Sequence, residues 1–306
     1  MAFESHTPYH NAQPLRGYPM RILQLLALTT ICFLSLAAFA ATPIPVSGAI
    51  TTSDGVRIHY LELGKGDPIV LIPGWTLPAD IWSGVMNSLQ DRYRVIAVDP
   101  RSQGDSDKPS DGNYPERRAR DYKELVDALK LKRPLLVGWS MAVPELLSYV
   151  DQFGVQNVRG VVLVDGFVKI DPAIASQLSI FFKQFASKRK EMTEGFVRSM
   201  FKNPPSEDEV AHLSASVLKT PTNSAMALMF AMLGTVDSTS GLAKLTGTPV
   251  LFEHTAQLQA QADIVQKALP SAKIHKYDTG HALFADGPEA MKTFVNNLND
   301  VMQSSK

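Results

Sequence analysis

The most informative part of this sequence is Gly138-Trp139-Ser140-Met141-Ala142. The apolar run Leu135–Val137 enters it and a helical pattern leaves it at Val143, so Ser140 lies on a bend between a strand and a helix. Such a bend needs small neighbours and presents the hydroxyl at the carboxyl edge of a sheet, beside the free N–H groups of a helix N-terminus. The pattern is G-x-S-x-G with alanine in the last place. It predicts a serine nucleophile on a strand–turn–helix unit.

The first forty residues have the pattern of a secretory signal peptide. Arg21 gives a positive start, residues 22–40 are almost wholly apolar, and Ala38-Phe39-Ala40 has the form of a cleavage site. We expect cleavage near Ala40/Ala41 and a periplasmic or secreted protein without stable membrane association. An N-terminal membrane anchor is the alternative. Cys32, the single cysteine, lies in this segment, so the exported chain would have no disulfide.

The remaining length and charge favour one large domain that binds a small molecule. Thirty basic and thirty acidic residues cancel in the 306-residue chain, and no basic stripe appears, which argues against nucleic acid as a partner. We divide the chain into four parts. They are an extension with the signal peptide (1–40), the first part of the core (41–166), a helical cap (167–245) and the second part of the core (246–306).

Short apolar runs alternate with helical patterns along the core. Residues 49–63 form a predicted hairpin around Asp54-Gly55. The further predicted strands are Ile69–Ile72, Val95–Val98, Leu135–Val137, Val161–Val164, Val250–Phe252 and Ile274–Tyr277. The helical stretches lie near Asp80–Leu89, Pro115–Leu129, Met141–Gln152, Ala256–Leu269 and Pro288–Leu298. Continuous apolar strands separated by helices indicate a mostly parallel, eight-stranded α/β sheet with helices on both faces.

This alternation is interrupted once, between Val164 and Val250, by about eighty residues with helical patterns and no clear strand. Phenylalanine and methionine are frequent there. Most of these side chains would pack the insertion onto the core, and a few would line an apolar substrate cavity over the strand ends. In the predicted helix Pro115–Leu129, which precedes this insertion, the Arg117–Arg120 run is interpreted as the solvated face.

A serine hydroxyl needs a base, and the base needs a group that orients it. Among seven histidines, His281 follows the last predicted strand, and Gly280 lets the chain turn there. His254, at the end of another strand, is the competitor. We therefore expect His281 to be the base that activates Ser140.

Four motifs in this order resemble the α/β-hydrolase fold superfamily over about residues 49–300. They are Ile72-Pro73-Gly74-Trp75, Asp99-Pro100-Arg101-Ser102-Gln103-Gly104-Asp105-Ser106, the Ser140 bend, and Gly280-His281 with Gly287-Pro288-Glu289. The branch it is most similar to contains small esterases, cofactor-free haloperoxidases and haloalkane dehalogenases. The resemblance implies a hydrolase with an oxyanion hole made by the backbone N–H groups of Trp75 and Met141. It also implies that Asp99 and Arg101 shape a loop.

The chain departs from this family at Pro73, Ser102 and Ala142, and most of all at the third catalytic group. The family usually places its acid after the seventh strand, where no carboxylate occurs here. Some members carry the acid after the sixth strand, where this chain has Asp165, so we take Asp165 as the acid. Glu253 and Asp263 are the weaker candidates.

The sequence thus predicts a carboxylesterase for small to medium apolar esters, acting through an acyl-enzyme without a metal or organic cofactor. The serine argues against dehalogenase and epoxide hydrolase chemistry, which in this family uses an aspartate nucleophile. Three alternatives stay open. They are haloperoxidase or perhydrolase activity on the same triad, an amidase, and a non-catalytic binding protein on a hydrolase scaffold.

Overall fold

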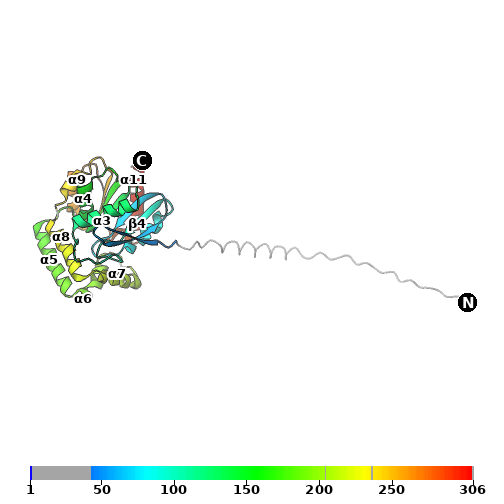
Figure 1. Ribbon diagram of the computed structural model, residues 1–306, viewed down its shortest axis with the longest axis horizontal. Coiled ribbons are helices and arrows are strands. Elements are labelled where there is room, and N and C mark those ends of the chain that lie inside the picture. Colours follow the sequence, from blue (N-terminus) through cyan, green and yellow to red (C-terminus); the bar gives the residue numbers. More distant parts are fainter. Residues whose placement is uncertain (2–42, 204, 236, 305–306) are drawn as a thin grey trace. The chain divides into compact units, whose positions relative to one another are not determined.

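The computed structural model describes Met1 and residues 43–203, 205–235 and 237–304. The predicted signal peptide and Cys32 fall within residues 2–42, outside the described residues. Residues 43–306 form one unit, which holds every element discussed below (Figure 1). Among the described residues, no helix is both long enough and apolar enough to cross a bilayer.

An eight-stranded sheet forms the centre of this unit, with the strand order β1-β2-β4-β3-β5-β6-β7-β8. The strands are β1 (Val46–Thr51), β2 (Arg57–Leu63), β3 (Asp67–Ile72), β4 (Tyr93–Val98), β5 (Leu135–Trp139), β6 (Gly160–Val164), β7 (Val250–Thr255) and β8 (Lys273–Tyr277). β2 pairs antiparallel with β1 and with β4, whereas all other neighbouring strands are parallel. The predicted hairpin, the six further strands and the mostly parallel sheet are confirmed.

Apolar side chains of the central strands alternate between two cores, one on each face of the sheet. Ile69 and Leu71 of β3 belong to one core, and Val70 and Ile72 belong to the other, as the two-residue period of a strand requires. Helices α2 (Ser83–Leu89) and α11 (Pro288–Ser304) cover the first core; α3 (Pro115–Ala128), α4 (Ala142–Phe153) and α10 (Gln259–Ala268) cover the second. The short 3-10 helices are η1 (Ala79–Trp82), η2 (Ala256–Leu258) and η3 (Leu283–Ala285).

The stretch between β6 and β7 is helical, and its described residues add no strand to the sheet. Its helices are α5 (Pro172–Ser187), α6 (Arg189–Ser199), α7 (Glu207–Lys219), α8 (Thr222–Thr235) and α9 (Thr239–Ala243). In Figure 1, α5, α6, α7 and α8 gather at one end of the unit. Trp75 and Met141, which follow β3 and β5, share an apolar cluster with α5 and α8. These helices therefore lie over the carboxyl ends of the central strands.

The prediction of a solvated arginine face on α3 was wrong. Arg118 is fully buried against α4, and its Nη1 lies 3.0 Å from Oε1 of Glu145. Arg117 pairs with Asp121 on the same helix, and only Arg120 is exposed. A run of charges at consecutive positions spreads around a helix, so its members do not share one face.

Candidate active site

Ser140 lies on the bend between β5 and α4, with a φ of 58°. This left-handed conformation is unfavourable for a residue with a Cβ, so the surrounding structure must hold it. Ser140 N donates to the carbonyl of Val164 at 2.8 Å. The neighbours must also be small, because a Cβ on Gly74 would lie 2.9 Å from the Cβ of Ser140. Ala142 is fully buried at the start of α4, so the bend accommodates alanine in the last place of the motif.

His281 and Asp165 complete a chain of hydrogen bonds from Ser140. Nε2 of His281 lies 2.8 Å from Oγ of Ser140, and its Nδ1 lies 2.7 Å from Oδ2 of Asp165. A carboxylate only accepts hydrogen bonds, so Nδ1 carries the proton and Nε2 is free to accept from the serine. The structure thus brings together the three residues that the sequence predicts, in the order that nucleophilic catalysis requires.

Hydrogen bonds to β7 fix the position of Asp165. It follows β6 directly, with a φ of 43°, and its backbone N donates to the carbonyl of Glu253 at 2.7 Å. Its Oδ1 accepts from the backbone N of Thr255 at 2.6 Å, and Oδ2 from the hydroxyl of Thr255 at 3.3 Å. The carboxylate is 2% exposed, whereas the imidazole of His281 is 35% exposed. Asp165 is therefore fixed, and His281 faces the open side of the site.

The other candidate groups point elsewhere. The carboxylate of Glu253, within β7, accepts from the hydroxyl of Tyr277 at 2.7 Å, and burial raises its pKa to about 7. Asp263 accepts from the side chain of Gln259 on the surface of α10. His254 is buried in β7, and its Nδ1 donates to the carbonyl of Thr255. None of these three side chains bonds to Ser140 or His281 among the described residues.

Two backbone N–H groups near Ser140 have no acceptor among the described residues, namely those of Trp75 and Met141. Unpaired N–H groups are rare in protein interiors, which makes these two available to a ligand oxygen. The indole of Trp75 donates to the carbonyl of Ala225 at 2.8 Å, and this bond fixes Trp75 against α8. Gln103 Nε2 donates to the carbonyls of Gly74 and Leu77, which holds the turn itself.

An apolar cavity of about 160 Å³ opens onto Ser140 and His281. Trp75 forms one wall, in edge-to-face contact with Phe182 and Phe185. Side chains of the inserted helices supply much of the rest, namely Leu178, Phe182, Phe196, Met200, Met229 and Met232. The expectation that a few of the aromatic and methionine residues line a cavity agrees with this arrangement, while Phe181 and Phe230 lie at the surface.

The sequence pattern did not identify two residues that form hydrogen bonds to His281 and Asp165. Trp139 precedes Ser140, and its Nε1 donates to the carbonyl of His281 at 2.9 Å. Thr255 is the last residue of β7 and binds Asp165. Both occupy carboxyl ends of strands, which is where ligand sites of parallel sheets lie. Position at the strand end is the signal that could have identified them.

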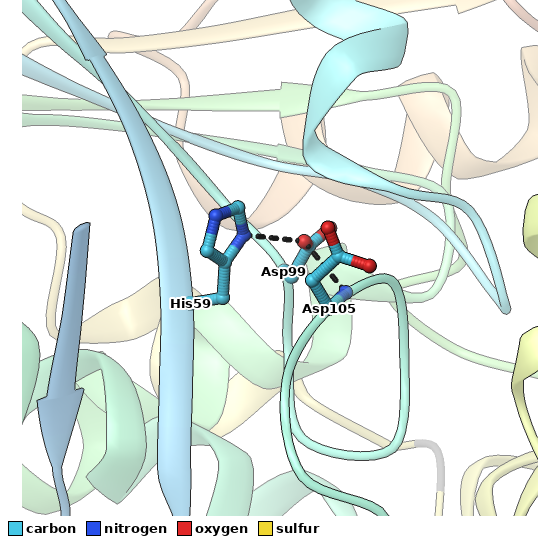
Figure 2. Close-up of side chains that lie close together, drawn as sticks. All are labelled: His59, Asp99 and Asp105. Carbon is cyan, nitrogen blue, oxygen red and sulfur yellow. Dashed lines mark hydrogen bonds and ion pairs between the residues drawn. The ribbon is translucent and has the colours of Figure 1, made fainter. Parts of the chain in front are cut away.

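A second group of titratable side chains, His59, Asp99 and Asp105, lies between β2 and the loop after β4 (Figure 2). Nδ1 of His59 lies 2.7 Å from Oδ2 of Asp99, and this oxygen also accepts from the backbone N of Asp105 at 2.9 Å. Ligands of a tetrahedral zinc ion, each about 2.0–2.2 Å from the metal, lie about 3.3 Å apart. The close contact is therefore a hydrogen bond. The ammonium of Lys219 already pairs with Asp105. The group therefore connects β2, the loop after β4 and the end of α7, and it does not form a metal site.

The comparisons identify the family and agree with the fold. Residues 67–288 match the family described as alpha/beta hydrolase fold. A non-heme chloroperoxidase from Streptomyces lividans is 40% identical over 120 residues, which are 38% of this chain and 44% of that protein. The chain thus aligns with less than half the length of such curated relatives.

Two solved structures have the same fold. An esterase from Exiguobacterium antarcticum has a TM-score of 0.76 at 22% identity, covering 84% of this chain and 100% of that one. A bromoperoxidase from Bacillus anthracis has the same TM-score, identity and coverage. At this identity they show the fold alone. The family match, however, covers most of the sequence, and the chain belongs to the α/β-hydrolase fold family.

Proposed function

We propose that this protein is a serine carboxylesterase that acts on small apolar esters through an acyl-enzyme. The observation that carries the proposal is the chain Asp165–His281–Ser140, with contacts of 2.7 and 2.8 Å, which ends in an apolar cavity beside two unpaired N–H groups. Nucleophile, base and orienting acid in this geometry are the elements of acyl transfer.

Each step uses a group of this chain. His281 Nε2 takes the proton of Ser140, whose oxygen attacks the ester carbonyl. The N–H groups of Trp75 and Met141 then stabilise the oxyanion. His281 returns the proton to the leaving alcohol and next deprotonates the water that releases the acid. Asp165 keeps the imidazole in the required tautomer and stabilises its positive charge.

The cavity sets the size of the substrate. Its volume of about 160 Å³ is close to that of an engineered apolar cavity of roughly 150 Å³ that binds benzene. Phe182 and Phe196 offer no hydrogen-bonding group to a polar chain. We therefore expect short acyl groups or a single aromatic ring to fit, and long acyl chains to bind only if α5 or α8 moves.

Labelling with a fluorophosphonate probe tests the proposal, because it reports an activated serine without a known substrate. We expect one adduct on Ser140 of the wild-type chain and none on Ser140→Ala or His281→Ala. Hydrolysis of a series of p-nitrophenyl esters should then fall with acyl length. A folded chain without an adduct would contradict the proposal and favour the non-catalytic binding scaffold.

Perhydrolysis is the second candidate function, and the names of the relatives favour it. Non-heme chloroperoxidases and a non-heme haloperoxidase are 36–40% identical to the matched part of this chain. Hydrogen peroxide in place of water at the acyl-enzyme would give a peroxyacid on the same three residues. Bromide oxidation that requires ester, peroxide and Ser140 would identify this activity.

A further inference from the structure

Among the described residues, four methionines line the cavity that holds Ser140. They are Met141, Met200, Met229 and Met232, whose exposed fractions are between 2% and 5%. Three come from the inserted helices or their ends, and Met141 follows the nucleophile directly. Bulk solvent therefore reaches these thioethers poorly, whereas a molecule formed at Ser140 starts beside them.

Thioethers are the side chains of this cavity that a peroxy oxygen oxidises most readily. The other described lining residues are aromatic or aliphatic, apart from Gly74 and the three residues Ser140, Asp165 and His281. Methionine sulfoxide is polar and chiral, so its formation disrupts an apolar wall. Oxidation at these positions would change both the shape and the polarity of the ester site.

The oxidant would arise from the proposed chemistry, on which this inference rests. Hydrogen peroxide attacks the acyl group on Ser140, the acyl–serine bond breaks, and the serine recovers its proton through His281. The product is a peroxyacid. Its terminal peroxy oxygen passes to a thioether, the O–O bond breaks, and the peroxyacid is reduced to the carboxylic acid while the thioether is oxidised to a sulfoxide.

We propose that Met141, Met200, Met229 and Met232 form an oxidation site for peroxyacids made at Ser140, so that perhydrolysis inactivates the enzyme from within its own cavity. Ester hydrolysis in water leaves these residues intact. Peroxide together with an ester converts them to sulfoxides, and the loss of esterase activity follows the number of perhydrolysis events.

Met291 provides an internal reference for oxidation from bulk solvent. It lies on α11 outside the cavity, is partly exposed, and its sulfur lies 3.9 Å from the hydroxyl of Ser88. An oxidant that arrives from solvent reaches Met291 before the buried cavity methionines. An oxidant released at Ser140 reverses this order.

The test incubates wild-type protein and Ser140→Ala with hydrogen peroxide, with and without a short-chain ester, and maps sulfoxides by peptide mass spectrometry. Hydrolysis of the same ester without peroxide is measured first. We expect severalfold more sulfoxide at the cavity methionines than at Met291, only in wild-type protein and only with ester. Ser140→Ala should show oxidation of Met291 first in every mixture.

Wild-type protein that hydrolyses the ester but keeps its cavity methionines reduced would overturn this inference and leave the esterase proposal standing. Absence of hydrolysis would overturn both. Equal sulfoxide formation in Ser140→Ala would also overturn the inference, because the oxidant would then come from solvent. As a second measurement, Met200→Leu/Met229→Leu/Met232→Leu should retain a larger fraction of its own starting activity after exposure than wild-type protein.

Discussion

The indole Nε1 of Trp139 donates a hydrogen bond to the backbone carbonyl of His281 at 2.9 Å, and the centres of the two rings are 5.1 Å apart. Trp139 is also the residue before Ser140. One side chain therefore connects the strand that carries the nucleophile to the loop that carries the base, and it fixes their separation.

Trp139→Phe should keep the aromatic packing and lose this hydrogen bond. We expect kcat to fall by about 10-fold to 100-fold with a small change in KM, because small displacements of a catalytic group cost about this much. Steady-state kinetics on a p-nitrophenyl ester measures the effect. Trp82→Phe is the matched control, since the buried indole N–H of Trp82 has no partner among the described residues. Equal kcat values for the two variants would show that the hydrogen bond does not position His281.

Asp165→Asn should lower kcat by up to about 10⁴-fold, the loss seen when the orienting acid of a serine protease triad becomes an amide. The amide cannot hold the imidazole in the tautomer that leaves Nε2 free. Asp263→Asn, on the surface of α10, should leave kcat unchanged. Full activity of Asp165→Asn would assign the role of the acid to another group.

The position of Asp165 shows how far the sequence predicts this site. Because carboxyl ends of parallel strands meet at one edge, the strand ends predicted that Ser140 and His281 converge. Asp165 was predicted from the resemblance to family members that carry the acid after the sixth strand. Which carboxylate serves as the acid depends on the direction in which each side chain points. Glu253 lies in the strand beside Asp165, but it faces Tyr277, and a single-residue difference in register decides between the two faces of a strand.

The sequence pattern did not predict which side chains of the helices contact one another. Arg118 lies in a charged run, and its burial depends on Glu145 of α4, which is far from it in sequence. The hydrogen bond from Trp139 to the carbonyl of His281 likewise depends on how the loop that carries His281 lies beside β5. Such long-range pairs leave no periodic signal, whereas strands and amphipathic helices do.

Glu253 should make the stability of the protein depend on pH. Burial raises its pKa to about 7 from an ordinary value of 4.5, so the folded state binds an extra proton between these values. This contribution to stability is fully present below about pH 4.5 and is lost as the pH rises to about 7, by at most about 1.4 kcal/mol per pH unit.

Glu253→Gln imitates the protonated carboxyl and keeps an acceptor for Tyr277 and Asn297. We expect its free energy of unfolding in urea to decrease less than that of wild-type protein between pH 5 and pH 8. Parallel curves for the two proteins would mean that Glu253 is ionised throughout this range in the folded state.

Arg118→Met should destabilise the protein by about 3–5 kcal/mol at pH 8, because it leaves the buried carboxylate of Glu145 without its cation. The two side chains are 0% and 1% exposed, and Glu145 also accepts a hydrogen bond from the hydroxyl of Tyr122. Burial already raises the pKa of Glu145 to about 7, and removal of the guanidinium raises it further. At pH 5 the carboxyl is protonated in the variant, so the loss of stability should be smaller than at pH 8.

Urea unfolding of Arg118→Met and of Arg120→Met, an exposed position on the same helix, separates the buried pair from the general effect of removing a charge. Arg120→Met should stay within about 0.5 kcal/mol of wild-type protein. Arg118→Met/Glu145→Gln should recover part of the loss, because no charge is then left unpaired. If Arg118→Met were as stable as Arg120→Met at pH 8, Glu145 would have to be neutral beside Arg118 in the wild-type protein. The pair would then contribute no net attraction between α3 and α4.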